Sequence, residues 1–171
     1  MGKDCKKISL GLFLATFHIN LGTVQIFPSA FGWLLVVLGV YAIAKVQEEP
    51  QINNAKKMSL ILFVIQLLDL FGVWNDIVTN AYIVSAMVSA IELLFVFYFF
   101  DGMIKMLEAK GNLDYASENE KMLSRYKILY IIGILLLCII GLVGINPLGS
   151  CIVVYMLVLR IYIIYRVYKL S

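Results

Sequence analysis

Two apolar runs, MSLILFVIQLLDLFGVW at residues 58–74 and IVTNAYIVSAMVSAIELLFVFYFF at residues 77–100, follow each other in the middle of the chain. Each is long enough to form a helix that crosses the roughly 30 Å of hydrocarbon in a bilayer. Each also contains an acidic residue well inside it, Asp69 in the first and Glu92 in the second. A charged side chain at such a depth costs about 3 kcal/mol on insertion scales, so it is normally paired, hydrated or functional. The sequence therefore predicts a membrane bundle built around these two residues.

The composition supports the same class of protein. The 171 residues are 62% hydrophobic and only 15% charged, whereas a soluble domain has about 25% charged residues. A soluble chain of this length could not bury so much apolar surface, but lipid can cover it in a polytopic membrane protein. The lipid bilayer is the expected partner. A net charge of +3 would ordinarily hint at nucleic acid or anionic lipid, but in this chain the distribution of charge matters more than its sum, and no nucleic-acid partner is expected.

Four further apolar segments lie outside the two central runs, which gives six expected spans. The fold class predicted is all-α, a single transmembrane domain of residues 1–171 with six transmembrane helices. The last segment is rich in Val and Ile, but it is too long and too poor in turn residues for buried strands. The expected spans cover residues 8–27, 29–46, 58–74, 77–100, 127–145 and 148–168.

Basic residues are distributed unevenly over the connections. The two chain ends and the even-numbered connections hold every Lys and Arg except Arg160, and the odd-numbered connections hold none. The protein is expected in the cell membrane. By the positive-inside rule, both of its termini are expected on the cytoplasmic side. Tyrosines near the inner ends of the last two spans, Tyr126, Tyr130, Tyr165 and Tyr168, are expected in the interfacial aromatic belt.

The only sizeable polar connection, residues 101–126, is expected to be a cytoplasmic helical hairpin. Gly111 and Asn112 predict a helix stop after the fourth span. The sequence Ser-Glu-Asn-Glu that begins at Ser117 fits a capping box with Glu120, so the fifth helix is expected to begin there. Its mixed charges indicate a solvated face, and a docking site for a cytoplasmic partner is the alternative.

Small residues recur at helical spacing in the first two spans. Gly11 and Ala15 share one face of the first span, and Gly32 and Gly39 share a face of the second. Small residues allow membrane helices to approach closely. The spacing of Gly11 and Ala15 is also one with which membrane subunits dock, so a membrane-protein partner or a homo-oligomer is an open alternative to packing within the chain.

Eight polar side chains within the predicted spans are candidate ligand-binding residues. Gln66 and Asp69 share a face of the third span, and Ser85, Ser89 and Glu92 share a face of the fourth. Arg160 could pair with Glu92 or with Asp69, or extend its charge toward the interface. A structural Arg–carboxylate clasp and a hydrated cluster that binds a ligand or carries protons are the two interpretations. The candidate set is His18, Asn20, Gln66, Asp69, Ser85, Ser89, Glu92 and Arg160.

The stretch HINLGTVQIFPSAFG, residues 18–32, is the other unusual feature. Gly22 and Pro28 favour irregular backbone, so the first helix could be broken before the outer surface, or an ordinary extracellular turn could lie there. The sequence predicts a polar-lined cavity in the outer half of the bundle, bounded by this stretch and the third and fourth spans. With carboxylates nearby, its ligand would be small and neutral or cationic.

This stretch resembles a motif of uncharacterised small polytopic membrane proteins of Gram-positive bacteria. The resemblance covers the first two spans well and the rest of the chain loosely. Ser29 stands where the motif has an acidic residue, which weakens the idea that it binds a cation. The resemblance implies location and architecture only, because the family carries no established activity.

Motifs of membrane and soluble enzymes are absent from the sequence. The single His excludes an HExxH zinc site, and neither G-x-S-x-G nor a P-loop occurs. No catalytic residue, metal or cofactor is therefore predicted. The sequence favours a small-solute binding or transport subunit, similar in length and number of spans to the substrate-binding subunits of energy-coupling-factor importers. The alternative is a structural or regulatory membrane protein that acts through helix–helix contacts.

Overall fold

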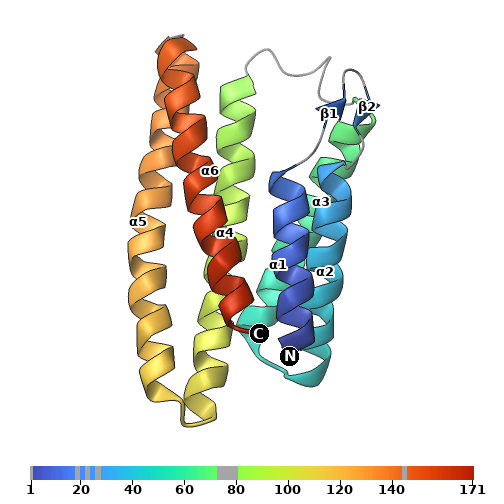
Figure 1. Ribbon diagram of the computed structural model, residues 1–171, viewed down its shortest axis with the longest axis vertical. Helices are drawn as coiled ribbons and strands as arrows, with labels where there is room; N and C mark the ends of the chain where they lie inside the picture. Colours follow the sequence, from blue (N-terminus) through green and yellow to red (C-terminus); the bar gives the residue numbers. More distant parts are fainter. Residues whose placement is uncertain (1, 18–19, 22–23, 26–27, 73–80, 144–145) are drawn as a thin grey trace.

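The computed structural model describes residues 2–17, 20–21, 24–25, 28–72, 81–143 and 146–171. These residues form a bundle of long helices with one short strand pair at one end (Figure 1). The helices are α1 (Gly2–Thr16), α2 (Ser29–Val46), α3 (Pro50–Leu70), α4 (Ala81–Ala109), α5 (Leu113–Val143) and α6 (Asn146–Lys169), and the strands are β1 (Asn20–Leu21) and β2 (Val24–Gln25).

The helices are arranged as a closed ring. Each packs against its neighbours in sequence, and α6 returns to pack against α1; over the described residues, no other pair of helix backbones meets. The two chain ends lie at the same end of the bundle (Figure 1). Side chains fill the centre of the ring, where Trp33 of α2 meets Phe95 of α4 edge to face at 5.5 Å between ring centroids.

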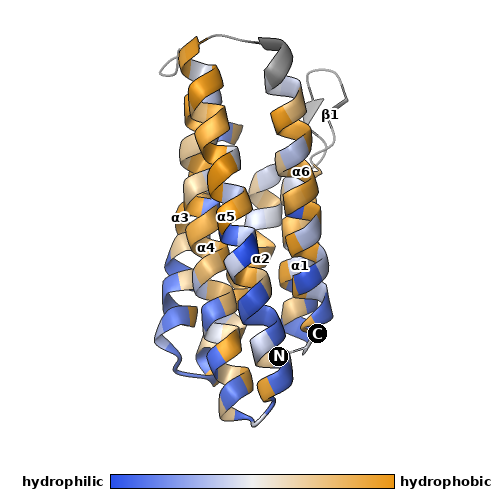
Figure 2. Cartoon of the chain, turned by 90° about the vertical axis from the view of Figure 1, so that its left-hand side faces the viewer, coloured by the Kyte–Doolittle hydropathy of each residue, from blue (hydrophilic) through white to orange (hydrophobic). Residues whose placement is uncertain are grey.

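Within the described residues, four helices are long and apolar enough to cross a membrane. The segments are Ser29–Val46, Tyr82–Ala109, Leu113–Val143 and Gly149–Lys169. Hydrophobic residues occupy the part of the bundle away from the chain ends, and hydrophilic ones gather near those ends (Figure 2). The chain is therefore a helical membrane protein whose apolar helices contact lipid. The other two helices fall outside this group, because α1 has only 15 residues and α3 begins with a polar stretch.

The first helix is shorter than predicted. It ends at Thr16, whereas the first predicted span continues to residue 27. The Thr16 hydroxyl donates to the carbonyl of Leu12 at 2.8 Å, a side-chain bond to the preceding turn that often occurs where helices bend or end. Beyond the helix, β1 and β2 pair antiparallel, with Asn20 opposite Gln25. A continuous first helix is therefore wrong, and His18 lies outside the described residues.

The connection between α4 and α5 is tighter than predicted. Gly111 has a φ of 76°, its N–H donates to the carbonyl of Glu108 at 2.9 Å, and the N–H of Asn112 donates to that of Leu107 at 3.0 Å. These two bonds are a Schellman motif, which confirms the predicted helix stop. Because the turn is complete at Asn112, α5 begins at Leu113. The predicted capping box is wrong, since Ser117 already lies inside the helix.

The small residues of α1 and α2 face each other. A β-carbon at Gly32 would lie 2.3 Å from the backbone nitrogen of Ala15 and 2.5 Å from the carbonyl oxygen of Gly11, closer than any side chain allows. Gly39 is likewise covered by Ile8 of α1. Helix backbones that approach so closely need glycine at the contact. The face of Gly11 and Ala15 is therefore occupied by α2 and is not free to dock a partner.

Candidate functional site

A charged cluster joins α4, α5 and α6 inside the bundle. Arg160 of α6 donates through Nη2 to Oε2 of Glu92 on α4, and the two form an ion pair. Tyr130 of α5 donates its hydroxyl to the same Oε2 atom at 2.8 Å. One carboxylate oxygen thus receives bonds from two other helices. Of the two pairings that the sequence left open for Arg160, the structure contains the one with Glu92.

The three side chains of this cluster differ in burial. Tyr130 is 1% exposed, the Glu92 side chain 12% and the Arg160 side chain 32%. The Nε atom of Arg160 is buried and has no hydrogen-bond partner among the described residues. Buried donors are nearly always bonded to protein or to an ordered water. The cluster is therefore electrically balanced but has one unsatisfied donor.

A small cavity of about 20 Å³ lies beside the cluster. A water molecule needs about 10–15 Å³ on this measure, whereas a pocket for an organic ligand holds about 300–1,000 Å³. The cavity thus has room for a water but not for an organic solute in this conformation. Five of the helices line it, through Leu12, Ala15, Thr16, Trp33, Glu92, Phe95, Val96, Tyr126, Tyr130, Arg160, Ile163 and Ile164.

The other predicted site residues lie away from this cavity. Gln66 on α3 accepts a hydrogen bond from the hydroxyl of Ser29 on α2. Asp69 is exposed, because α3 ends at Leu70 and places it in the last turn instead of deep in a span. Ser85 is also exposed, and Ser89 is 4% exposed but does not line the cavity.

These four residues do not line this cavity. The predicted outer cavity, bounded by residues 18–28 and the third and fourth spans, stays a prediction, because much of its boundary lies outside the described residues. The cavity beside the charged cluster takes no lining residue from α3. Glu92 and Arg160 are the two predicted residues that meet there. His18 lies outside the described residues, as does the side chain of Asn20, which belongs to β1.

Two tyrosines of the site were assigned to the wrong environment by sequence. Tyr126 is 3% exposed and Tyr130 1%, so neither belongs to an interfacial belt, whereas Tyr165 and Tyr168 are 59% and 55% exposed. The buried pair is in ring contact, with centroids 5.2 Å apart. Their spacing carried a usable signal, because Tyr126, Tyr130 and Gly133 follow one helix face that the sequence marks as packed.

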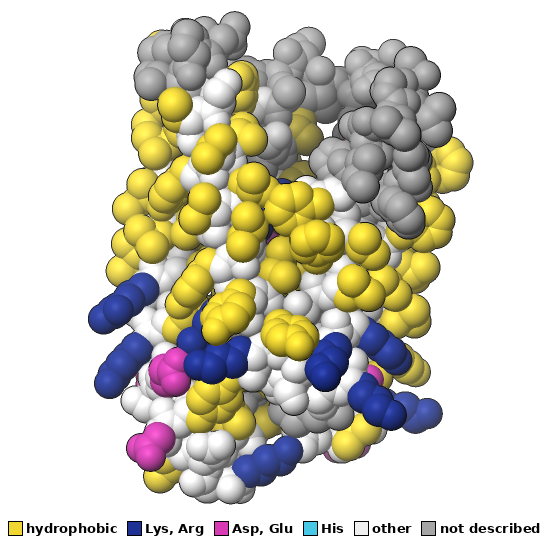
Figure 3. Space-filling view, viewed as in Figure 1, with side chains coloured by type: hydrophobic (Ala, Val, Ile, Leu, Met, Phe, Trp, Pro, Cys, Tyr) yellow, Lys and Arg dark blue, Asp and Glu magenta, His cyan; other side chains and the backbone are white. Residues whose placement is uncertain are grey.

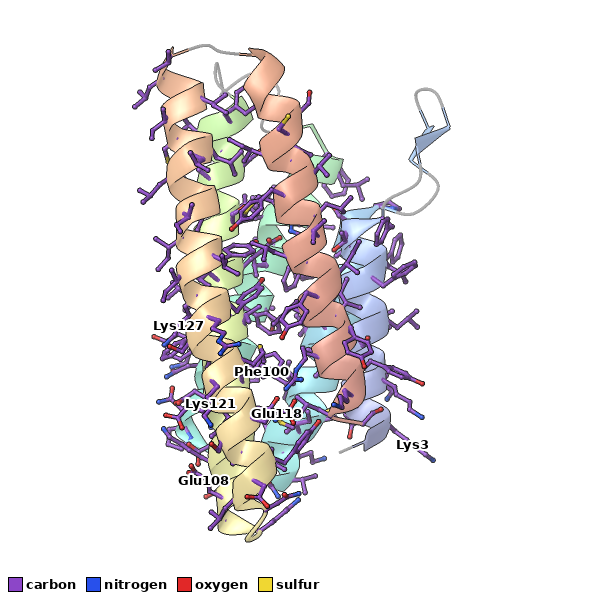
Figure 4. All side chains as sticks on the ribbon, turned by 60° about the vertical axis from the view of Figure 1, so that its left-hand side comes forward. Lys3, Phe100, Glu108, Glu118, Lys121 and Lys127 are labelled. Atoms are coloured by element: carbon purple, nitrogen blue, oxygen red, sulfur yellow. The ribbon has the colours of Figure 1, made fainter. Side chains whose placement is uncertain are left out.

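A second polar cluster fastens the α4–α5 hairpin to the end of α6. Arg166 donates to Glu118 at 2.7 Å and to the side-chain oxygen of Asn119 at 3.0 Å. Asn119 in turn donates to the carbonyl of Tyr115 at 2.7 Å. The hydrogen bond from Arg166 lowers the pKa of the Glu118 carboxyl, and the positive charges of Arg166 and Lys169 act in the same direction. Figure 4 places Glu118 in the lower part of the bundle, opposite the end that carries the strands.

The chemistry of the main cluster is that of a balanced ion pair with a tyrosine. Within the described part of the chain, no group of three or more His, Cys, Asp or Glu side chains could hold a metal ion. Comparison with protein-family models, with curated proteins and with solved structures found no match, so the site is interpreted from its own geometry.

Proposed function

We propose that this chain is a six-span protein of the cell membrane with both termini in the cytoplasm, and that it acts as a structural or regulatory protein through its helix–helix contacts. The observation that carries the proposal is the bonding of one Glu92 oxygen by α5 and α6 together, beside a cavity with room for a water only. A site built this way holds helices in a fixed relation and leaves no space for an organic ligand.

The distribution of charge supports the proposed orientation. Lys and Arg side chains gather on the part of the molecule near the chain ends, and hydrophobic side chains cover the visible surface above them (Figure 3). Basic residues favour the cytoplasmic side. The helix from Ile8 to Thr16 covers only about 12 Å at 1.5 Å per residue.

The clasp then lies in the cytoplasmic leaflet. Tyr130 is three residues from Lys127 on α5, which corresponds to about 5 Å along the axis. Arg160 is five residues from the exposed Tyr165 on α6, or about 8 Å. At this depth hydrocarbon surrounds the bundle, so a charge that loses its partner is costly. The pair is therefore expected to hold α4 and α6 in one arrangement.

Reporter fusions test the topology. A reporter that is active only in the cytoplasm should be active when fused after Asn112 and inactive when fused after Asn75 or Asn146. The fusion after Asn112 also serves as the expression control for the other two. Cytoplasmic activity at Asn75 or Asn146 would contradict the six-span arrangement, because the two predicted spans on either side of that fusion site would then not cross the membrane.

A small-solute binding or transport subunit is the second candidate. It is favoured by the meeting of five helices around a cavity lined by Arg160, whose buried Nε atom has no hydrogen-bond partner among the described residues. In this case the cavity would have to widen when a solute enters. Neutral and cationic solutes should then raise the melting temperature of the purified protein, and Thr16→Val, in the cavity lining, should reduce that rise.

The matched control for this test is Ser85→Ala, because Ser85 is an exposed hydroxyl residue outside the cavity. A solute whose effect is lost in Thr16→Val and kept in Ser85→Ala would favour the transport candidate over the structural one. A panel of solutes with no effect on melting would leave the structural candidate as the better account.

A further inference from the structure

Over the described residues, no ion pair is found for the lysines near the cytoplasmic ends of α1, α2 and α3. All the ion pairs found at this end of the described chain belong to α4, α5 and α6: Lys105 with Asp101 at 3.0 Å, and Glu118 with Arg166 at 2.7 Å and with Lys169 at 4.0 Å. Residues 2–57 hold six lysines and only three carboxylates, those of Asp4, Glu48 and Glu49. Net positive charge is therefore concentrated on the side of the bundle formed by the first three helices.

Two of these lysines flank an exposed aromatic ring. The ammonium group of Lys56 on α3 lies 5.5 Å from the centroid of the Tyr41 ring on α2. Lys45 follows Tyr41 by four residues on α2, so both project from the same face of that helix. Tyr41 is 55% exposed, and neither lysine forms an ion pair within the described residues. Two ammonium groups and a phenol hydroxyl thus form an open, positively charged cradle.

An apolar surface adjoins the cradle on its membrane side. Leu38 lies three residues before Tyr41 on α2, and Leu60 lies four residues after Lys56 on α3, one turn further into the membrane on each helix. Their side chains are 52% and 51% exposed. Val64, a further turn along α3, is 44% exposed. Positive charge followed by exposed aliphatic surface matches the order of groups in a phospholipid, headgroup first and acyl chain next.

We propose that the cradle of Tyr41, Lys45 and Lys56 binds the phosphate of an anionic phospholipid, with its acyl chain against Leu38 and Leu60. The lysines supply charge, the Tyr41 hydroxyl supplies a hydrogen bond to a phosphate oxygen, and the leucines hold the chain. A free phosphate would satisfy the lysines but would leave the aliphatic surface without a partner. Charge attraction favours lipids with net negative charge over zwitterionic ones. This site is separate from the clasp and goes beyond the proposed function.

Native mass spectrometry of the full chain, released from micelles that contain phosphatidylglycerol, measures the occupancy of this site. Each lysine near an anionic lipid surface contributes roughly a fivefold change in affinity. The variant Lys45→Gln/Lys56→Gln should therefore bind phosphatidylglycerol about 25-fold more weakly. The matched control Lys121→Gln/Arg125→Gln removes the same charge from exposed positions of the α4–α5 hairpin, and it should change binding less than about twofold.

Three results would overturn the proposal. The first is equal weakening in both variants, which would indicate general charge attraction only. The second is phosphatidylcholine bound as tightly as phosphatidylglycerol by the unmodified chain. The third is full displacement of the lipid by glycerol phosphate at matched concentration, which would identify a site for free anions. The melting temperature of each variant serves as the folding control, since neither variant alters the clasp.

Discussion

Replacing Arg160 with leucine is expected to destabilise the bundle by leaving Glu92 without its cation. In the unmodified chain the carboxylate accepts bonds from Arg160 and from Tyr130 at one oxygen, and its side chain is only 12% exposed. The substitution removes the positive charge of Arg160, the cation bonded to Glu92 among the described residues, and replaces it with a shorter aliphatic side chain. The Tyr130 bond remains, but a neutral hydroxyl cannot balance a full negative charge.

The magnitude follows from the burial of the pair. Stranding one partner of a buried ion pair costs about 3–5 kcal/mol. The Arg160 side chain is 32% exposed, so the pair is only partly buried, and the lower end of this range, about 3 kcal/mol, is expected. For a chain of this size each kcal/mol shifts the melting temperature by about 2–4 °C. The variant should therefore melt about 6–12 °C below the unmodified protein.

A thermal-melting cycle in detergent checks the interaction itself. The variants are Arg160→Leu, Glu92→Gln and the combination of the two, and the combination should recover at least half of the loss because no charge is left stranded. Arg125→Leu, at an exposed position of α5, is the control and should shift the free energy of unfolding by less than about 0.5 kcal/mol.

Two outcomes would refute the reasoning. If Arg160→Leu melts at the same temperature as the unmodified protein, the Glu92 charge does not need Arg160, and the ion pair does not contribute to the stability of the bundle. If the losses of the two single substitutions simply add in the combination, the two residues act independently, and their contact in the structure has no energetic meaning.

Three further predictions concern other parts of the bundle. Gly32→Val should destabilise by more than about 3 kcal/mol, because its β-carbon would meet the backbone of α1 at 2.3 Å, whereas Gly111→Ala should cost only about 1–2 kcal/mol for its left-handed φ; similar melting temperatures for the two would contradict the close contact. The lowered pKa of Glu118 means that its ion pair stabilises the fold at neutral pH, and that this stabilisation is lost as pH falls below about 4.5. Between pH 7 and pH 3, the melting temperature of the unmodified protein should therefore fall more steeply than that of the Arg166→Gln variant. Burial raises the pKa of the Cys5 thiol to about 11, so iodoacetamide at pH 8 should label Cys5 far more slowly than a cysteine placed on the exposed hairpin; equal rates would show that Cys5 is accessible.

Local sequence rules were enough to predict three features. These are the helical class, the turn after α4, and the need of Arg160 for a carboxylate partner. Apolar runs of spanning length and the Gly111 stop need only neighbouring residues to be read. The position of Arg160 alone within a span predicted a carboxylate partner, because an isolated charge in hydrocarbon is so costly. Arg160 pairs with Glu92 and not with Asp69 because α3 ends at Leu70, next to Asp69. The end of α3 depends on the folded structure and could not be predicted from the local sequence.

The errors have a common physical cause, which is that patterns within one segment do not reveal what covers it. Ser117 begins a good capping box, but the Schellman turn had already allowed α5 to start. Tyr126 and Tyr130 look like interfacial residues until α6 and α4 bury them. The face of Gly11 and Ala15 could serve any helix, and the structure assigns it to α2.

The closed order of the helices has a consequence for how the protein is made. Among the described residues, every interface between helix backbones joins elements that leave the ribosome one after the other, except the interface between α6 and α1. Five interfaces can therefore form during synthesis with little cost in loop closure. The face of α1 that α6 covers, where the Ser9 hydroxyl donates to the carbonyl of Ile164, therefore stays uncovered in the nascent chain until α6 has been synthesised. A chaperone or insertase could shield this face of α1 until α6 packs against it. A chain released before α6 is made would leave this face of α1 uncovered.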